Sequence, residues 1–191
     1  MTTTLIRATD VVPQAWRNGG GTTRELLARP EGAWRVRVSV AEVACDGPFS
    51  AYPGVQRWFA VLKGAGVELT IDGAMRRVTR IDAPFAFAGD AATQCRLLDG
   101  PTRDLNLMLR GARGGLSLVE DGLPWHSHAG QCGLFTAVEG RCHVDDGQAI
   151  ALPHHALLWF DPAPASLQFF AEQRLPAATG WWLAATPEDA P

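Results

Sequence analysis

The sequence predicts an all-β protein whose chain folds into two similar barrel-like or sandwich-like halves. Apolar segments of strand length alternate with turn residues, and 20 Gly and 13 Pro are distributed along the 191 residues. No long segment has the periodicity of an amphipathic helix. A set of segments in the first half also recurs, in the same order, in the second half. Many short strands joined by turn residues are typical of a β-sandwich or β-barrel.

Strands of the first half are indicated by side chains that alternate with period two. In segment 35–40 three valines occupy one face, while two arginines and a serine occupy the other. Segment 104–109 alternates three leucines with Asp, Asn and Met in the same way. Segment 67–71 alternates as well, and the Asp-Gly pair at 72–73 then predicts a hairpin, because both residue types tolerate positive φ.

The repeat consists of a strand, a Gly turn, a second strand, an Asp-Gly hairpin, an aromatic strand and a final strand. The first copy comprises segments 59–64, 67–73, 83–87 and 104–109, and the second comprises 135–140, 142–147, 156–160 and 180–184. This order is that of a cupin half, so its duplication predicts a bicupin. We expect residues 1–110 to form an N-terminal barrel that carries any ligand pocket. Residues 111–191 would form a mainly structural second barrel, after a Gly-rich linker within 111–130.

Composition argues against several classes of protein. The net charge is −3, and Lys63 is the single lysine of the chain, so no basic cluster is available to neutralise nucleic-acid phosphates. No segment approaches the roughly 20 apolar residues of a membrane span, and the N-terminus lacks the apolar stretch of a signal peptide. The four cysteines show no CxxC spacing and are interpreted as reduced thiols. We therefore expect a cytoplasmic protein that binds neither nucleic acid nor membranes.

The sequence contains no strong motif for a metal site or for a catalytic nucleophile. All five histidines lie in the second half: His126, His128, His143, His154 and His155. The HxH pair at 126–128 has no Glu a few residues later, and adjacent histidines on a strand point to opposite faces. No GxSxG motif occurs. The sequence thus predicts no metal site and no cofactor.

The segment 16–25, with three consecutive glycines, is the most unusual local feature. Glycine is favoured where a chain turns sharply or approaches a ligand, and successive N–H groups there could form an anion-binding concavity. Two structural alternatives remain open. One is an Asn-Gly hairpin followed by a strand, and the other is a helix capped by Thr22 and Glu25.

Two further segments carry polar candidates. Segment 47–57 combines two prolines and two glycines with aromatic residues, which indicates a rigid loop, and it ends at Arg57. That guanidinium either binds a carboxylate bidentately or is an exposed arginine at a strand start. The polar face of segment 104–108 either meets water or lines the interior of a barrel.

Together these segments resemble the HutD/Ves family, which is associated in many bacteria with histidine utilisation. The matching motifs are Trp16-x-Asn18-Gly-Gly-Gly-x-Thr23-x-Glu25, Arg37-x-Ser39-x-Ala41, Gly47-Pro-Phe-Ser-x-Tyr-Pro-Gly-x-x-Arg57 and Asp104-x-Asn106-x-Met108. Two positions depart from the family pattern. Val36 stands where a Trp is common, and Tyr52 replaces the usual Phe before Pro-Gly.

The resemblance implies a bicupin that binds a small carboxylate-bearing metabolite and acts as a sensor or modulator of histidine utilisation, without a settled enzymatic activity. A homodimer is possible. The expected ligand-binding residues come from the matched motifs: Trp16, Asn18, Gly19, Gly20, Thr23, Glu25, Arg37, Ser39, Phe49, Ser50, Arg57, Asp104 and Asn106.

Two other functions remain alternatives. The first is a small-acid isomerase, hydrolase or lyase that uses Glu25 or Asp104 as general base, and for it the catalytic residues are unknown. The second is a carbohydrate-binding module in which exposed tryptophans serve as stacking platforms, with Trp181 and Trp182 as candidates.

Overall fold

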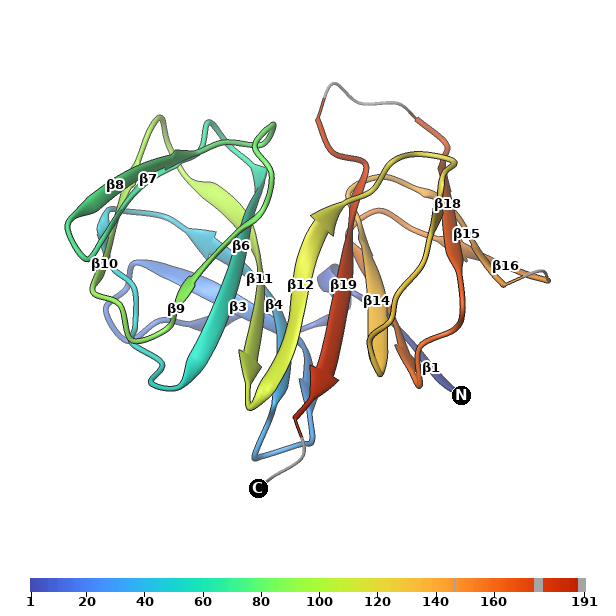
Figure 1. Ribbon diagram of the computed structural model, residues 1–191. Helices are drawn as coiled ribbons and strands as arrows, with labels where there is room; N and C mark the ends of the chain where they lie inside the picture. Colours follow the sequence, from blue (N-terminus) through green and yellow to red (C-terminus); the bar gives the residue numbers. More distant parts are fainter. Residues whose placement is uncertain (146, 174–176, 189–191) are drawn as a thin grey trace. The chain divides into compact units, whose positions relative to one another are not determined.

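The computed structural model describes residues 1–145, 147–173 and 177–188, and it confirms the all-β prediction. Apart from one short 3-10 helix, η1 (Ala8–Asp10), the regular elements in these ranges are strands. The chain forms two compact units (Figure 1). Unit 1 comprises Met1–Val11 and Ala112–Glu188, and unit 2 contains Val12–Gly111. The described part of the chain has no helix long and apolar enough to span a membrane.

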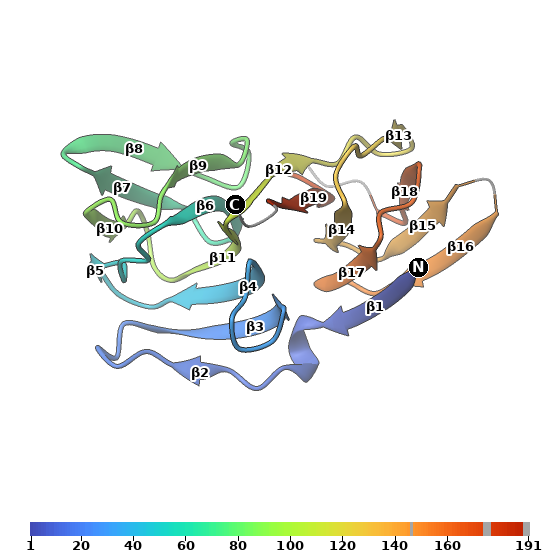
Figure 2. The same cartoon turned by 60° about the horizontal axis from the view of Figure 1, so that its bottom comes forward.

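Unit 2 consists of two antiparallel sheets that face each other across a core (Figure 2). The six-stranded sheet has the order β2 (Gln14–Ala15), β3 (Gly21–Arg29), β4 (Val36–Val43), β11 (Thr102–Arg110), β6 (Val55–Lys63) and β9 (Phe85–Ala88). The four-stranded sheet has the order β5 (Gly47–Pro48), β10 (Thr93–Leu97), β7 (Val67–Ile71) and β8 (Ala74–Val78).

Unit 1 is built in the same manner. Its five-stranded sheet has the order β1 (Thr2–Arg7), β17 (Ala156–Asp161), β14 (Gln131–Thr136), β19 (Gly180–Pro187) and β12 (Ala112–Leu118). Its four-stranded sheet has the order β13 (Pro124–Trp125), β18 (Leu167–Ala171), β15 (Gly140–Val144) and β16 (Gln148–Leu152).

The strand orders confirm the duplication. The sequence β11-β6-β9 in unit 2 corresponds to β19-β14-β17 in unit 1, and β5-β10-β7-β8 corresponds to β13-β18-β15-β16. Each unit is therefore a two-sheet sandwich with cupin connectivity rather than a closed barrel. The predicted hairpin at Asp72-Gly73 has φ values of 47° and 85°, which a two-residue type I′ turn requires. Its counterpart in unit 1 includes residue 146, which lies outside the described residues.

The boundary between the units falls at Gly111, whose φ of 54° allows a sharp turn between β11 and β12. The expected halves were 1–110 and 111–191, but residues 1–11 belong to unit 1, because β1 pairs with β17 over six residues. The expected linker at 111–130 also contains two strands, β12 and β13. A Cβ at Gly114 would lie 1.9 Å from the Ala184 carbonyl oxygen, so this glycine serves the close approach of β12 to β19.

The interior of unit 1 is packed with apolar side chains. Trp182 lies in this core and stacks on Trp125, with ring centroids 4.9 Å apart. The alternative of a carbohydrate-binding module with Trp181 and Trp182 as stacking platforms loses its support, because each side chain is 2% exposed. Neither tryptophan can serve as a surface platform for a sugar. The core of unit 2 instead borders a cavity, which Val43 and Phe59 line from the core side.

Candidate functional site

A cavity of about 470 Å³ lies within unit 2, lined by strands of the six-stranded sheet and by the loops before β3 and β6. Most of the residues predicted from the sequence motifs meet there: Trp16, Asn18, Thr23, Arg37, Ser39, Phe49, Ser50, Arg57, Asp104 and Asn106. Gly19, Gly20 and Glu25 do not line it, although Gly20 lines a smaller neighbouring cavity of about 210 Å³.

Strand pairing places side by side the residues of β4, β11 and β6 that line one side of the cavity, which we call its floor. On β4 and β11 the alternate residues face the cavity, and in the register of this pair Asn106 lies opposite Ser39 and Met108 lies opposite Arg37. On the other side of β11, Arg57 of β6 is paired with Met108. Of the two alternatives for the polar face of segment 104–108, the structure shows the second: this face lines the cavity and does not lie on the outer surface.

Arg57 is the central cation of this floor. It is 6% exposed, its Nη2 donates to Asn106 Oδ1 at 3.2 Å, and its buried Nε has no partner among the described residues. The guanidinium lies over the rings of Phe87 at 4.9 Å and Phe49 at 5.1 Å, which is cation–π geometry. Desolvation lowers the pKa of Arg57 to about 10, so the group remains charged at neutral pH. A buried guanidinium with an unused donor has the chemistry to bind a carboxylate.

Asp104 is the second buried ionisable group. It is 0% exposed and is among the residues that line the cavity. Oδ2 accepts a hydrogen bond from Thr102 Oγ1 at 2.9 Å, and the buried Oδ1 has no partner within the described ranges. Burial raises the pKa of Asp104 to about 8, and the Thr102 hydrogen bond opposes this only in part. The group is therefore mostly protonated at neutral pH.

Arg37 is held by partners on both sides. Its Nε donates to Glu25 Oε2 at 2.6 Å, and its Nη1 donates to Met108 Sδ at 3.5 Å. Glu25 is exposed and lies outside the cavity lining, so it influences the cavity only through its ion pair with Arg37. This ion pair positions the Arg37 guanidinium at the cavity wall.

The glycine segment forms a hairpin between β2 and β3, so the helix alternative is wrong. Gly19 has a φ of 71°, its N–H donates to the Trp16 carbonyl at 3.0 Å, and the Gly20 N–H donates to Asn18 Oδ1 at 3.1 Å. Both N–H groups are therefore used within the turn rather than offered to an anion. The hairpin instead positions Trp16, whose Nε1 donates to Thr23 Oγ1 at 2.8 Å in the cavity wall.

The proline-rich loop is held by backbone hydrogen bonds to the start of β10 and to the residue that follows β9. The Phe49 N–H donates to the Thr93 carbonyl at 2.9 Å, and the Tyr52 N–H donates to the Gly89 carbonyl at 2.7 Å. These bonds hold Phe49 and Ser50 at the cavity. Sequence reasoning missed four lining residues with functional groups: Gln14, Arg17, Tyr52 and Met108. Met108 and Tyr52 were within matched motifs, so their positions beside Asn106 and Ser50 were the available signal.

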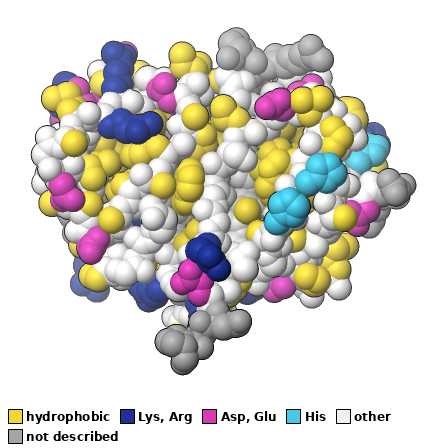
Figure 3. Space-filling view, viewed as in Figure 1, with side chains coloured by type: hydrophobic (Ala, Val, Ile, Leu, Met, Phe, Trp, Pro, Cys, Tyr) yellow, Lys and Arg dark blue, Asp and Glu magenta, His cyan; other side chains and the backbone are white. Residues whose placement is uncertain are grey.

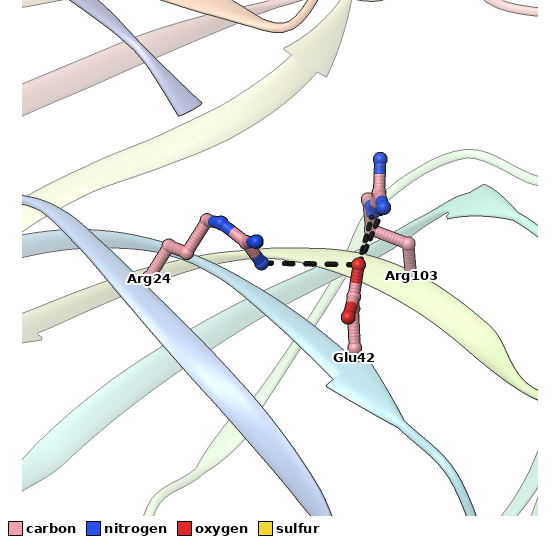
Figure 4. Close-up of polar contacts among 3 residues, drawn as sticks. All are labelled: Arg24, Glu42 and Arg103. Atoms are coloured by element: carbon pink, nitrogen blue, oxygen red, sulfur yellow. Dashed lines mark hydrogen bonds and ion pairs between the residues drawn. The ribbon is translucent and has the colours of Figure 1, made fainter. Parts of the chain in front are cut away.

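The lining is positively charged. Arg17, Arg37 and Arg57 face a single acidic residue, Asp104, among the lining residues. A further cluster of Arg24, Glu42 and Arg103 lies on β3, β4 and β11 on the face of the sheet opposite the cavity (Figure 4). Arg24 Nη1 lies 3.8 Å from Glu42 Oε1, and Arg103 hydrogen-bonds the same oxygen. These partly exposed pairs join neighbouring strands and contribute little to stability individually.

The histidines lie away from the cavity. All five belong to unit 1, and those visible in Figure 3 lie over that unit. His154 is paired with Glu139 at 3.5 Å, and His126 hydrogen-bonds the Ala165 carbonyl at 3.3 Å. Over residues 1–145, 147–173 and 177–188, no group of three or more His, Cys, Asp or Glu side chains could hold a metal ion.

Comparison with known proteins relates this chain to one family. The family model described as HutD matches residues 8–177. Protein Ves of Citrobacter koseri is 34% identical over 160 residues, a match that covers 72% of this chain and 81% of that protein. An uncharacterised 21.2 kDa protein in the hutC 3′ region of Pseudomonas putida is 39% identical over 110 residues, and the match covers 54% of this chain and 56% of that relative.

Solved structures give the same result. The chain resembles a conserved protein of unknown function from Pseudomonas aeruginosa PAO1, with a TM-score of 0.85, 30% identity, and coverage of 97% of this chain and 99% of that one. It resembles HutD from Pseudomonas fluorescens SBW25 (formate condition) with a TM-score of 0.82, 29% identity, and coverage of 97% and 98%. Oxalate decarboxylase of Bacillus subtilis, at 9% identity, a TM-score of 0.64, and coverage of 97% and 77%, shares the fold alone.

Proposed function

The chain belongs to the HutD/Ves family, and we propose that it binds a small carboxylate-bearing metabolite in the cavity of unit 2. The observation that carries the proposal is Arg57, a buried and charged guanidinium whose Nε faces no partner in the described chain. A buried donor of this kind costs free energy unless an acceptor reaches it, and a carboxylate satisfies two guanidinium donors together.

The cavity wall supports a small organic acid over an inorganic anion. Phe49, Tyr52 and Phe59 provide apolar surface beside the polar floor, and ligand pockets commonly combine such walls with a few fixed polar groups. The volume of about 470 Å³ is within the range of small-molecule sites.

The names of two relatives support the proposed role of a sensor or modulator of histidine utilisation. One is described by its position in the hutC 3′ region and another is called HutD, in a structure of the formate condition. We transfer to this chain the expectation that its ligand is an acid related to histidine breakdown. Binding of that acid would report the metabolic state.

An enzyme is the second candidate, and Asp104 is the observation that favours it. A carboxyl with a pKa of about 8 in a cavity is suited to proton transfer near neutral pH. In that case the protein would be a small-acid isomerase, hydrolase or lyase. Glu25 is a weaker general base because it is exposed and ion-paired with Arg37.

Calorimetric titration tests the binding function. Purified protein would be titrated with urocanate, formiminoglutamate, formylglutamate, glutamate, histidine and formate, and with divalent metal ions. We expect one of the acids to saturate the protein. Because Arg57→Met removes the charged donors at nearly constant volume, it should weaken that binding by about 2 kcal/mol or more.

The control is Arg96→Met on β10, because its side chain is 60% exposed and pairs with Glu68 outside the cavity lining. This variant, and His126→Ala and His154→Ala in unit 1, should bind the acid as the unmodified protein does. Saturation by metal ions alone, or equal binding by the Arg57→Met variant, would refute the carboxylate site. Slow conversion of a bound acid, followed by NMR and lost in Asp104→Asn, would establish the enzyme instead.

A further inference from the structure

We propose that Asp104 is a specificity-determining residue of the cavity: its unpaired carboxyl oxygen donates a hydrogen bond to a second acceptor group of the ligand. The site then selects acids that carry a carbonyl or a similar acceptor several atoms away from the carboxylate, and it does so only while Asp104 is protonated. This inference rests on the proposed binding function, because it concerns the far end of the ligand that Arg57 holds.

The hydrogen bonds of Asp104 leave one position open. Thr102 Oγ1 donates to Oδ2, which is therefore the carbonyl-like oxygen of a protonated carboxyl, and this leaves the proton on Oδ1. Oδ1 is buried and has no partner in the described residues, although Asp104 lines the cavity. A buried donor without an acceptor is costly, so an acceptor atom from a ligand is the group that this position lacks.

The surroundings of Asp104 keep the carboxyl neutral by burial and not through a neighbouring anion. Burial raises its pKa to about 8, with the Thr102 hydrogen bond as the opposing contribution. The other ionisable groups that line the cavity are Arg37 on β4, Arg57 on β6, and Arg17 and Tyr52 in loops. Outside the lining, Cys95 on β10 interacts electrostatically with Asp104 and with Asp46, and Glu25 on β3 is paired with Arg37. Of these, burial raises the pKa of Cys95 to about 12, and Arg57 keeps its charge up to about pH 10.

Spacing along β11 sets the size of the ligand. The Arg57 guanidinium contacts Asn106, and Asp104 lies two residues further along the same face of the strand. Two residues of a strand span about 7 Å. A one-carbon acid can satisfy Arg57 but cannot also reach Asp104. An acid with four or five carbons and a second acceptor can satisfy both unused donors, Arg57 Nε and Asp104 Oδ1.

Charge selects against an amine at the second position. Arg17, Arg37 and Arg57 line the cavity, so a ligand ammonium would meet three cations and a neutral carboxyl. A carbonyl acceptor carries no such penalty. The substrate class that fits is therefore an oxo or acyl carboxylic acid, not a zwitterion with its ammonium at Asp104.

The experiment compares two acids that differ by one carbonyl group. The full chain would be titrated by calorimetry with 4-oxopentanoate and with pentanoate between pH 6 and pH 9. At pH 6.5 we expect 4-oxopentanoate to bind about tenfold more tightly, because only it supplies an acceptor to Asp104. Above pH 8 this tenfold preference should disappear, because the ionised carboxylate of Asp104 no longer donates the hydrogen bond.

Two variants separate the hydrogen bond from the shape of the cavity. Asp104→Leu removes the donor at similar volume and should make the two acids bind equally. Asp104→Asn retains an N–H donor that does not titrate, so it should retain the preference and lose its pH dependence. The Asn variant also keeps the test valid if the Leu variant fails to fold.

The failures of the two proposals are distinguishable. If both acids bind with dependence on Arg57 but with equal affinity, or if Asp104→Leu retains the preference, the role of Asp104 is refuted and the carboxylate site stands. If neither acid binds the unmodified protein and no acid of the wider panel does, both proposals fail. A preference that is independent of pH in the unmodified protein refutes the proton requirement.

Discussion

Burial gives two side chains of the cavity unusual properties at the scale of single residues. Arg57 remains a cation although it is 6% exposed, and Asp104 holds a proton at neutral pH although it is an ordinary aspartate in sequence. Each also retains one unused hydrogen-bonding atom among the described residues. Unpaired buried polar atoms are uncommon and destabilising, and a ligand, a water molecule or an ion can complete their hydrogen bonds.

The raised pKa of Asp104 makes the stability of the protein depend on pH. An unfolded chain releases this proton near pH 4, whereas the folded protein retains it up to about pH 8. Between these values the folded state binds the extra proton, so this group lowers the free energy of unfolding by about 1.4 kcal/mol for each unit that the pH rises. Above pH 8 the free-energy contribution of Asp104 to unfolding no longer changes with pH, because both states have released the proton.

Urea unfolding of the unmodified protein and of Asp104→Asn at pH 5, 6, 7 and 8 measures this contribution. The asparagine does not titrate, so the variant should gain stability relative to the unmodified protein as the pH rises. Other titrating groups cancel in the difference. Parallel pH dependences of the two proteins would show that Asp104 is ionised in the folded state.

At the scale of elements, the hairpin of β2 and β3 determines the mouth of the cavity. Gly21 begins β3 opposite Val43, and a Cβ at this position would lie 2.1 Å from the Glu42 carbonyl oxygen. The glycine therefore permits β3 to approach β4, which places Thr23 and Trp16 at the cavity wall. The Gly-rich segment thus serves packing of the backbone, while its neighbours Trp16 and Thr23 line the cavity.

Gly21→Ala should destabilise the protein by about 1–3 kcal/mol, because the added methyl group collides with backbone that cannot rotate away. The same change should weaken acid binding in the calorimetric assay, since Thr23 moves with β3. Gly130→Ala is the matched control, because that glycine has no atom within 4 Å of an added Cβ and no left-handed φ. Equal unfolding midpoints for the two variants would show that β3 accommodates the methyl group added at Gly21 without a loss of stability.

At the scale of the whole chain, the N-terminal strand completes the sheet of unit 1. Six residues of β1 pair with β17, whose residues Ala156–Phe160 are all buried. Unit 1 is thus formed from both ends of the sequence, while unit 2 occupies the stretch between them. Without β1, an apolar strand would become an exposed sheet edge, which favours aggregation.

A variant lacking residues 2–7 should lose about 3 kcal/mol or more of stability from the missing strand pairing, and it should aggregate. Thermal unfolding and light scattering measure the two effects, with removal of Met1 alone, which is 68% exposed, as the control. Because the cavity is built from residues of unit 2, any remaining monomer should bind acids with unchanged affinity. An unaltered melting temperature would mean that β1 contributes no stability to unit 1.

The sequence by itself determined the strands, the duplication and the composition of the cavity floor. Alternation on β4 and β11 is a local property of the chain. It puts Arg37 and Ser39 on one face of β4, and Asp104 and Asn106 on one face of β11, wherever the two strands lie in the fold. The family motifs identified the loops for the same reason, since each is contiguous in sequence. Gly19 and Gly20 were included with them although they do not line the main cavity.

Only the tertiary structure decided which unit β1 joins, how deeply each floor residue is buried, and which of its atoms lack a partner. Strand pairing between residues 2–7 and 156–161 depends on contacts distant in the chain, which alternation does not encode. The pKa of Asp104 and the open donor of Arg57 depend on desolvation by residues from several strands. Burial is a sum over neighbours in space, and for that reason it appears only once the chain has folded.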